Sequence, residues 1–361
     1  MTDVLDDYTI EQFVFKPEDQ KKYLEIVRTV FLNHKAEAGG TILFDEQTFD
    51  IMFGSTYTDR DLFIRATHKE TGEIVGFLGA IPRHLYYQGK TYKFGVPAWL
   101  SVHHKHQRKG LSRAMGMKLL EYGASVGFDG GFVEFDADDH GIDTFSSVFR
   151  RYDYEVSELL RMKQFVVRVF DVNKLSSAMR LNKIEKFALK LLQKVPEVKN
   201  PQIRKGTPSD HERIYELLQD HKERNELSVI RQKDDFLWYL NRPGVNLVVH
   251  EDENGVVDGF IIAWKFQISG FGNIVDFGWL DCVHLHRLTP NDAKDLCKYL
   301  SVAAKELGWV GIQTPYIPYF NPKPLKRAKF MFYSKTMIIF SFKFKPTPIP
   351  KKVKSFYFDW R

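Results

Sequence analysis

The sequence predicts an α+β protein made of two similar units in tandem, each a mixed, mostly antiparallel sheet flanked by helices. Two observations support this prediction. A strand, a loop, a helix and a second strand follow one another over residues 96–139, and patterns of the first half return in the second half. The 361 residues are 43% hydrophobic and 14% aromatic, which is enough apolar material for two cores of ordinary size.

The elements of the first half follow from apolar spacing and turn residues. Gly72 and Gly89 lie at expected hairpin bends, and Gly127 ends a helix that begins at Leu111. The predicted order is a strand over 7–15, helices over 17–31 and 44–53, strands over 62–68, 74–85 and 98–102, the helix from Leu111, a strand over 132–135, and a further helix and strand over 142–154.

The second half repeats landmarks of the first. Residues 70–77 (ETGEIVGF) return 183 positions later as 253–260 (ENGVVDGF), with both glycines and the phenylalanine in place. In the same order, PED at 17–19 is echoed by PSD at 208–210, and SVGF at 125–128 by ELGW at 306–309. Three ordered matches indicate an internal repeat. We expect an N-terminal unit over 1–170, a Lys-rich helical linker over 171–200, and a second unit over 201–361.

The turn between residue 102 and the helix at Leu111 has the features of an anion site. Gly110 allows a backbone conformation that other residues disfavour, and it leaves room for a close approach. The first turn of the helix offers unpaired N–H groups and the positive end of the helix dipole. Arg108, Lys109 and Arg113 add positive charge. A pyrophosphate group fits this combination.

This stretch resembles motif A of the GNAT superfamily of acyl-CoA-dependent acyltransferases, in which a strand precedes Gln/Arg-x-x-Gly-x-Gly/Ala and a helix. Here LSV at 100–102 and QRKGLS at 107–112 fill those places, with Ser112 where Gly or Ala is usual. The resemblance implies two tandem GNAT units and a thioester held between strands 98–102 and 132–135, which splay apart. It implies that acyl-CoA is bound by Leu100, Ser101, Val102, Gln107, Arg108, Lys109, Gly110, Leu111, Ser112 and Phe149.

The corresponding loop of the second unit, residues 284–291, has no glycine at the turn. We therefore expect one acyl-CoA site, in the N-terminal half, while the C-terminal half shapes the acceptor side. Residues 138–140 (DDH) follow the second strand of the motif and either line the mouth for the acceptor or begin the next helix.

Acyl transfer from a thioester to an amine needs a proton acceptor for the amine and a proton donor for the departing thiolate. Glu134 and Asp136 alternate onto one face of their strand, and burial beside a thioester would raise the pKa of a carboxyl group. The alternative is that Glu134 lies at an edge or pairs with an arginine. Phe149 stands where the family usually has a tyrosine that acts as the general acid, and a phenylalanine side chain cannot donate a proton. Ser146, Tyr152 or solvent remain as donors.

No metal site is expected from the sequence. His103, His104 and His106 lie within four residues at a strand end, where side chains rarely converge on one centre, and no carboxylate stands at ligand spacing. Cys282 and Cys297 are too few and too far apart for a zinc site or a disulfide framework. We expect both cysteines in the core.

The C-terminal stretch 323–361 holds eleven Lys/Arg and one Asp, a local charge of +10 in a chain of net charge +6. Residues 340–345 (FSFKFK) alternate as in a solvated strand, and an acidic partner such as a phospholipid surface or nucleic acid is the alternative. No nucleic-acid module supports the latter. The closing FYFDWR at 356–361 is weakly similar to the aromatic end of N-myristoyltransferases, whose terminal carboxylate serves as catalytic base; a final strand is the other interpretation.

The sequence thus predicts a cytoplasmic, acyl-CoA-dependent N-acyltransferase, with no apolar run of the ~20 residues that span a bilayer. Family resemblance favours transfer of acetyl from acetyl-CoA to a primary amine on a small molecule or peptide. Two alternatives stay open. One is a catalytically silent acyl-CoA binding or sensing protein, motivated by Phe149; the other is a long-chain N-acyltransferase at a membrane surface, suggested by the basic, aromatic C-terminus.

Overall fold

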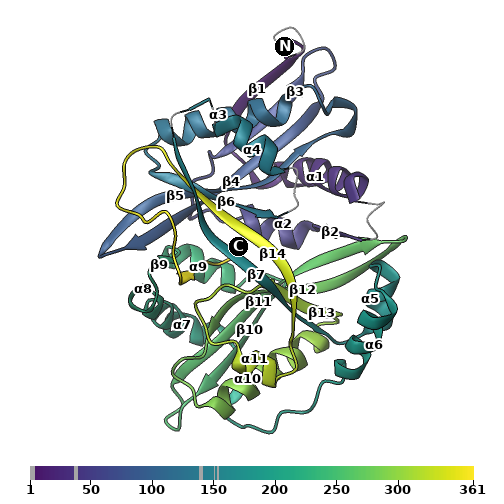
Figure 1. Ribbon diagram of the computed structural model, residues 1–361, viewed down its shortest axis with the longest axis vertical. Coiled ribbons are helices and arrows are strands. Elements are labelled where there is room, and N and C mark those ends of the chain that lie inside the picture. Colours follow the sequence, from purple (N-terminus) through teal and green to yellow (C-terminus); the bar gives the residue numbers. More distant parts are fainter. Residues whose placement is uncertain (1–4, 36–39, 138–140, 150, 153) are drawn as a thin grey trace.

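The computed structural model describes residues 5–35, 40–137, 141–149, 151–152 and 154–361. Strands cross the molecule from end to end, and helices lie on both sides of them (Figure 1). The first half contains β1 (Tyr8–Phe13), η1 (Pro17–Asp19), α1 (Gln20–Lys35), β2 (Thr41–Leu43), α2 (Glu46–Phe53), β3 (Phe63–His68), β4 (Ile74–Tyr87), β5 (Lys90–Val102), η3 (His104–His106), α3 (Leu111–Ser125), β6 (Gly130–Asp136), α4 (Gly141–Phe149) and β7 (Glu155–Val169).

The second half begins after the helices α5 (Val172–Ala178) and α6 (Lys183–Leu192). It contains β8 (Ile203–Lys205), η4 (Pro208–Asp210), α7 (His211–Leu218), α8 (Asp220–Arg224), β9 (Leu227–Val229), α9 (Lys233–Leu240), β10 (Val245–Glu251), β11 (Val257–Gly270), β12 (Asn273–His284), α10 (Pro290–Glu306), β13 (Gly311–Pro315), α11 (Lys323–Arg327), β14 (Met331–Lys343) and β15 (Phe356–Tyr357). No described helix is long and apolar enough to cross a lipid bilayer.

The strands form one continuous sheet in the order β1-β3-β4-β5-β6-β14-β7-β13-β12-β11-β10-β8. Neighbours along this order are antiparallel except for two parallel pairs, β5 with β6 and β12 with β13. Each half contributes one of these parallel pairs. The predicted α+β class, with two units of mixed and mostly antiparallel sheet, is therefore confirmed.

The internal repeat extends to the register of the strands. Phe77 on β4 pairs with Ser101 on β5, and Phe260 on β11 pairs with His284 on β12, so both members of the second pair lie 183 residues after those of the first. The 3-10 helices η1 and η4 occupy the two places where a Pro-x-Asp pattern recurs. The repeat is thus structural as well as sequential.

The two halves exchange strands at the centre of the sheet. β14, from the C-terminal half, lies between β6 and β7, while β7 pairs on its other side with β13 (Figure 1). The interpretation of residues 340–345 as a solvated strand is wrong, because β14 ends at Lys343, lies between two other strands, and buries Ser341, Phe342 and Lys343. Lys343 is buried, and its Nζ donates to Glu155 at 2.8 Å. The division at residues 170 and 200 stays a prediction.

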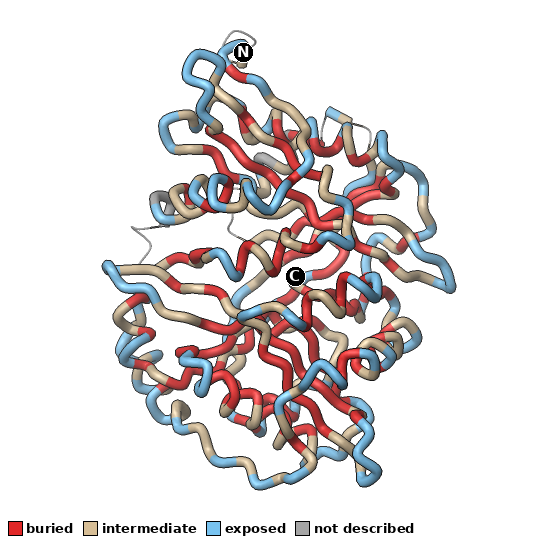
Figure 2. Tube along the Cα trace, turned by 180° about the vertical axis from the view of Figure 1, so that it is seen from behind, coloured by how far each residue is buried: buried red, intermediate tan, exposed pale blue. Residues whose placement is uncertain are grey.

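Helices cover opposite faces of the N-terminal strands, as the alternation of side chains requires. Leu111, Met115 and Leu119 of α3 pack with Ile64 and Leu78 on one face. On the other face α1 and α2 pack against the neighbouring positions of the same strands, including Phe63 and Phe77. Buried residues run through the middle of both halves, and the C-terminus lies at the centre of the view (Figure 2). The closing segment forms the short strand β15, which pairs with β9.

Candidate functional site

The loop before α3 has the open backbone that the sequence predicts. Gly110 is the residue just before the helix, with φ of +85°, and a Cβ there would have no protein atom within 4 Å. Arg108 also has positive φ, at +61°. The side chain of Gln107 ties the loop to the end of β5, because its Nε2 donates to the carbonyl oxygen of Val102 at 3.0 Å. Helix α3 begins at Leu111, as predicted.

A cavity of about 250 Å³ lies directly on this loop. Its lining consists of Val102, His106, Gln107, Arg108, Gly110, Leu111, Ser112 and Arg113. Lys109, which the sequence also places at the phosphate, turns toward β1 instead, where its Nζ donates to the hydroxyl of Tyr8 at 2.9 Å. That hydroxyl also contacts Nδ1 of His106 at 2.8 Å. Lys109 therefore braces the loop, while two arginines and the first turn of α3 face the cavity.

Strands β5 and β6 are paired only where β6 begins, near the middle of β5. Phe94 pairs with Gly130 and Gly95 with Gly131, and no further pair joins the two strands. The expected splay between them is confirmed. β5 continues to Val102 with β4 as its only strand neighbour among the described strands, which also explains how Pro97 is tolerated within β5. Backbone groups on the open edge of β5 are thus available to a ligand.

A β-bulge interrupts β5 at the splay. Ala98 pairs with Gly79 and Ser101 with Phe77, so Trp99 and Leu100 form the bulge. Trp99 has φ of +60°, unusual for a bulky residue, and its ring is held in a stack on Phe44 at 3.9 Å. The hydroxyl of Ser101 donates to the carbonyl oxygen of Trp99 at 3.0 Å. Nothing in the sequence around Trp99 indicates a bulge.

A second and larger cavity, of about 590 Å³, follows the splay. Most of its lining side chains are apolar: Val30, Phe31, Leu78, Pro97, Ala98, Trp99, Leu100, Val102, Gln107, Ser112, Gly116, Leu119, Leu120, Val133, Glu134, Phe135, Gly141, Phe145, Val148, Phe149 and Phe342. The two cavities share Val102, Gln107 and Ser112. The two cavities therefore adjoin, and together they mark a path from the loop to Glu134.

Glu134 is the acidic residue on this path. It is half-buried, its Oε1 has no hydrogen-bond partner among the described residues, and burial raises the pKa of its carboxyl from 4.5 to about 7. The positive charge of Arg83 opposes part of this rise. Arg83 itself is ion-paired with Asp359 at 3.4 Å. Glu134 therefore combines an oxygen atom that lacks a hydrogen-bond partner among the described residues with a carboxyl group whose pKa is near neutrality.

The other predicted catalytic residues lie off the path. Asp136 forms an ion pair with Lys335 on β14 at 2.9 Å and does not line the cavity. Ser146 is on α4 outside the lining. The hydroxyl of Tyr152 donates to Glu121 at 2.7 Å, and burial together with this carboxylate raises the pKa of the tyrosine. Residues 138–140, expected near the acceptor, lie outside the described residues.

Phe149 lies at the wall of the cavity, as its place in the sequence predicts. Its ring packs on Phe145 at 4.4 Å and on Phe342 at 4.8 Å. Phe342 belongs to β14 and so comes from the C-terminal half. No local signal in the sequence connects it with residues 193 positions earlier, and only the strand exchange brings it to the site.

In the second unit the corresponding strands β12 and β13 also splay apart, but a side chain closes the space between them. β12 and β13 share two parallel pairs, and β12 has an irregularity at Asp281, which matches the bulge in β5. Here the N–H of Val283 donates to the hydroxyl of Tyr319 at 3.0 Å. The remaining cavity, lined in part by Tyr319 and Trp360, is about 10 Å³. This geometry agrees with the expectation of one acyl-CoA site in the first half.

A buried ionic cluster joins the two halves next to the site. Its members are three arginines and three aspartates, all at most 3% exposed: Arg83, Arg231, Arg361, Asp235, Asp281 and Asp359. Arg231 bridges Asp359 at 2.6 Å and Asp281 at 3.2 Å. The backbone N–H of Trp360 donates to Asp281 at 2.6 Å. The cluster holds the C-terminal segment against both units.

Comparison with known proteins agrees with this geometry. Residues 15–127 match the family model described as an acetyltransferase (GNAT) domain. No curated protein sequence matches the chain. Among solved structures, the chain is similar to Saccharomyces cerevisiae N-myristoyltransferase with bound myristoyl-CoA, with a TM-score of 0.73 and 18% identity over 94% of this chain and 84% of that chain.

Two further structures extend the likeness. Saccharomyces cerevisiae N-myristoyltransferase with myristoyl-CoA and inhibitors gives a TM-score of 0.72 and 18% identity, covering 94% of this chain and 81% of that chain. An Enterococcus faecalis protein described as a probable N-acyltransferase gives 0.52 and 13%, covering 92% and 72%. The predicted GNAT superfamily fold, in a layout similar to N-myristoyltransferases, is confirmed.

Proposed function

We propose that this chain, which has the GNAT fold in the layout of N-myristoyltransferases, is an acyl-CoA-dependent N-acyltransferase with Glu134 as general base. The observation that supports this most directly is the pair of adjoining cavities that lead from the Gly110 loop to Glu134. The diphosphate of coenzyme A would bind at the loop, between the first turn of α3 and the side chains of Arg108 and Arg113. Pantetheine and the thioester would follow the open edge of β5.

The chemistry that this arrangement can perform is direct transfer to an amine. An alkylamine has a pKa near ~10.4 and must lose a proton to attack the thioester. A carboxylate with pKa about 7 accepts that proton at neutral pH far better than an ordinary one. Backbone N–H groups at the Trp99 bulge would stabilise the oxyanion. Phe149 supplies no proton, so solvent protonates the leaving thiolate, whose pKa is near ~8.5.

Acetyl is the acyl group that the sequence predicts, and the matched family model is named for acetyl transfer. A second candidate, a longer acyl chain, is favoured by one observation. The cavity of about 590 Å³ is lined mostly by aliphatic and aromatic side chains, which suit an alkyl chain better than they suit a two-carbon group alone. Coenzyme A binding at the loop is common to both candidates.

A surface feature also fits the second candidate, if the long acyl chain is transferred at a membrane surface. Helix α6 exposes Ile184, Phe187 and Leu191 at 81%, 66% and 65%, on one face and flanked by lysines, and it lies at the edge of the molecule (Figure 1). We expect Phe187→Asp to abolish sedimentation with phosphatidylserine vesicles, while Leu307→Asp, on an exposed residue of the second unit, leaves it unchanged. Failure of the unmodified protein to sediment would remove the membrane alternative.

The acceptor would be a primary amine on a small molecule or a peptide. We propose that the first unit, residues 1–170, binds acyl-CoA and that the second unit, residues 201–361, shapes the acceptor side across the linker at 171–200. Three features are consistent with this division. The splay of the second unit is closed by Tyr319, the ionic cluster places the C-terminal segment beside the path, and Phe342 enters the wall of the cavity.

Thiol release from a series of acyl-CoA esters tests the proposal. Protein, a panel of amines and peptides, and acetyl-, octanoyl- or myristoyl-CoA are mixed, and free coenzyme A is followed with a thiol reagent. Release that requires an amine supports transfer, and the ester used fastest identifies the acyl group. Tight binding of acyl-CoA without release would support the silent binding protein instead, and absence of both would refute the proposed function.

A further inference from the structure

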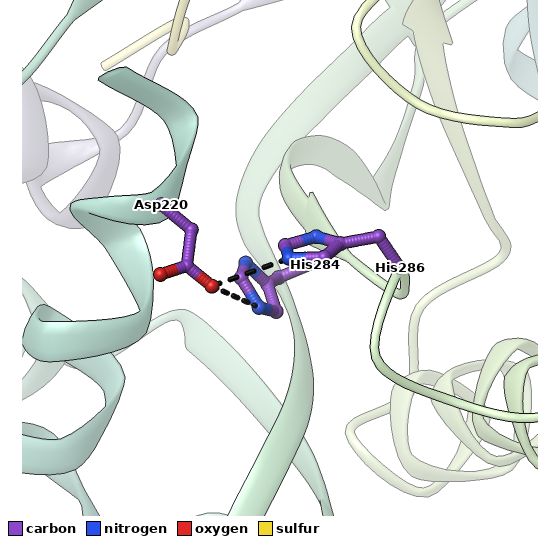
Figure 3. A group of neighbouring side chains, drawn as sticks. All are labelled: Asp220, His284 and His286. Carbon is purple, nitrogen blue, oxygen red and sulfur yellow. Dashed lines mark hydrogen bonds and ion pairs between the residues drawn. The ribbon is translucent and has the colours of Figure 1, made fainter. Parts of the chain in front are cut away.

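A second group of chemically reactive side chains lies in the C-terminal unit, away from the acyl-CoA path. Asp220 begins α8, His284 ends β12, and His286 lies in the loop that follows, and all three point toward one another (Figure 3). Oδ2 of Asp220 is 3.2 Å from Nε2 of His286 and 3.7 Å from Nε2 of His284. One oxygen and two nitrogens thus converge within 4.8 Å of one another.

The buried ring of His284 packs on neighbours but forms no hydrogen bond with the described residues. Its side chain is fully buried and stacks on Phe260 at 5.1 Å with an interplanar angle of 6°. Neither ring nitrogen makes a hydrogen bond to any residue that the structure describes. Such unpaired buried nitrogens are costly, and they are uncommon in native proteins unless a ligand satisfies them.

The distances from Asp220 to the two histidine nitrogens suit a tetrahedral ion. Zinc binds histidine nitrogen and carboxylate oxygen at about 2.0–2.1 Å, which sets neighbouring ligand atoms about 3.3 Å apart. The separations of 3.2 and 3.7 Å lie close to that distance. His286 and Asp220 are 19% and 24% exposed at the side chain, so an ion and a water molecule can enter from solvent.

We propose that Asp220, His284 and His286 bind a divalent transition metal ion of the zinc type, with water as the fourth ligand. Two imidazoles and one carboxylate are a donor set that zinc accepts readily. By the 183-residue repeat, His284 corresponds to Ser101, at the end of the strand that leads to the phosphate loop in the first unit. The second unit thus carries a cation site where the first carries an anion site, and the metal ties the loop after β12 to α8.

Replacement of Arg287 distinguishes a metal site from a cluster that only stabilises the fold. Its guanidinium donates to the same Oδ2 of Asp220 through Nε at 2.9 Å and contacts it through Nη2 at 2.7 Å. The side chain is 41% exposed and is free to move aside. Because it competes with the metal for this oxygen and adds like charge, Arg287→Ala should tighten metal binding while it removes a contact from the fold.

The experiment is a titration of chelator-treated, full-length protein with ZnCl₂ by calorimetry and with CoCl₂ by visible absorption. We expect one equivalent of each ion, and the intense absorption of tetrahedral Co²⁺. His286→Ala and Asp220→Asn should weaken Zn²⁺ binding by at least about 10-fold, since loss of mere outer-shell partners already costs that much. Arg287→Ala should strengthen it.

Two controls keep the result interpretable. His284→Ala removes a core side chain, so the partly exposed His286 and Asp220 carry the test, with circular dichroism to verify that each variant folds. His104→Ala, in the histidine-containing loop of the first unit, reports adventitious binding there and should leave Zn²⁺ affinity unchanged. The proposal is overturned if wild type takes up no Zn²⁺, if His286→Ala and Asp220→Asn bind like wild type, or if His104→Ala alone abolishes binding.

Discussion

Replacement of Glu134 by glutamine is the most direct test of the proposed chemistry. The change keeps the shape of the side chain and removes its ability to accept a proton. A positioned general base contributes about 10²- to 10⁴-fold to the rate, which corresponds to about 3–5 kcal/mol of transition-state stabilisation. We expect Glu134→Gln to lower kcat by that factor with little change in acyl-CoA affinity, because the Gly110 loop, where we propose that coenzyme A binds, lies at the other end of the path.

The pH dependence gives the prediction a second, independent measurement. Burial raises the pKa of Glu134 to about 7, so in wild type kcat/KM should rise as pH increases through about 7, and this inflection should be absent from Glu134→Gln.

The free energy of unfolding should fall as pH increases over the same range. The fold favours the neutral carboxyl, so its contribution is complete below the unfolded pKa of about 4.5 and is lost as pH rises through about 7. The difference between the two pKa values corresponds to at most about 3 kcal/mol.

Initial rates of thiol release from about pH 5.5 to about pH 9, and guanidinium unfolding at low and high pH, measure both effects. Glu134→Gln should gain stability relative to wild type at high pH. Asp136→Asn is the comparison, since this carboxylate is on the same strand face but is paired with Lys335 outside the cavity. The reasoning is refuted if Glu134→Gln keeps the wild-type rate and inflection, or if Asp136→Asn loses as much activity.

Three further predictions concern the Gly110 loop, the closed splay of the second unit, and Phe149 at the position of the usual proton donor. Gly110 and Gly89 have similar positive φ and open space at Cβ, so Gly110→Asp and Gly89→Asp should cost similar stability, but only the former should weaken coenzyme A binding, by at least about 10-fold in calorimetry. Tyr319→Phe leaves the N–H of Val283 without its acceptor and should lower the free energy of unfolding by about 1–3 kcal/mol without changing coenzyme A affinity. Phe149→Tyr places a hydroxyl at the cavity wall and should raise kcat if thiolate protonation limits turnover; an unchanged rate would show that solvent suffices.

Local signals allowed much of the fold to be predicted from the sequence. Helix α3 begins at Leu111 because Gly110 adopts the left-handed conformation that the turn requires, and this is visible in a short window. The repeat was also visible, because the hairpin residues of Gly76-Phe77 and Gly259-Phe260 must keep their spacing to keep strand register. Such features depend on neighbours in the chain, and the sequence contains those neighbours.

Features that depend on distant contacts were not visible. The alternation of residues 340–345 indicates a strand but not its neighbours, so the place of β14 between β6 and β7 was missed. Glu134 and Asp136 look alike as alternating residues of one strand. They differ because Lys335 of β14 forms an ion pair with Asp136, whereas Oε1 of Glu134 has no hydrogen-bond partner among the described residues. A pKa is set by these tertiary surroundings and not by the strand pattern.

The exchanged strands also give the closed second unit a structural role beside the open first one. β14 supplies one wall of the cavity through Phe342, and β7 in return pairs with β13 of the second unit. Removing β14 would leave the edges of β6 and β7 unpaired and the cavity open on one side. The second unit therefore completes the sheet and the cavity of the first. Its own splay is closed by the hydrogen bond from Val283 to Tyr319, and Asp281 on β12 binds the backbone of the C-terminal segment at Trp360.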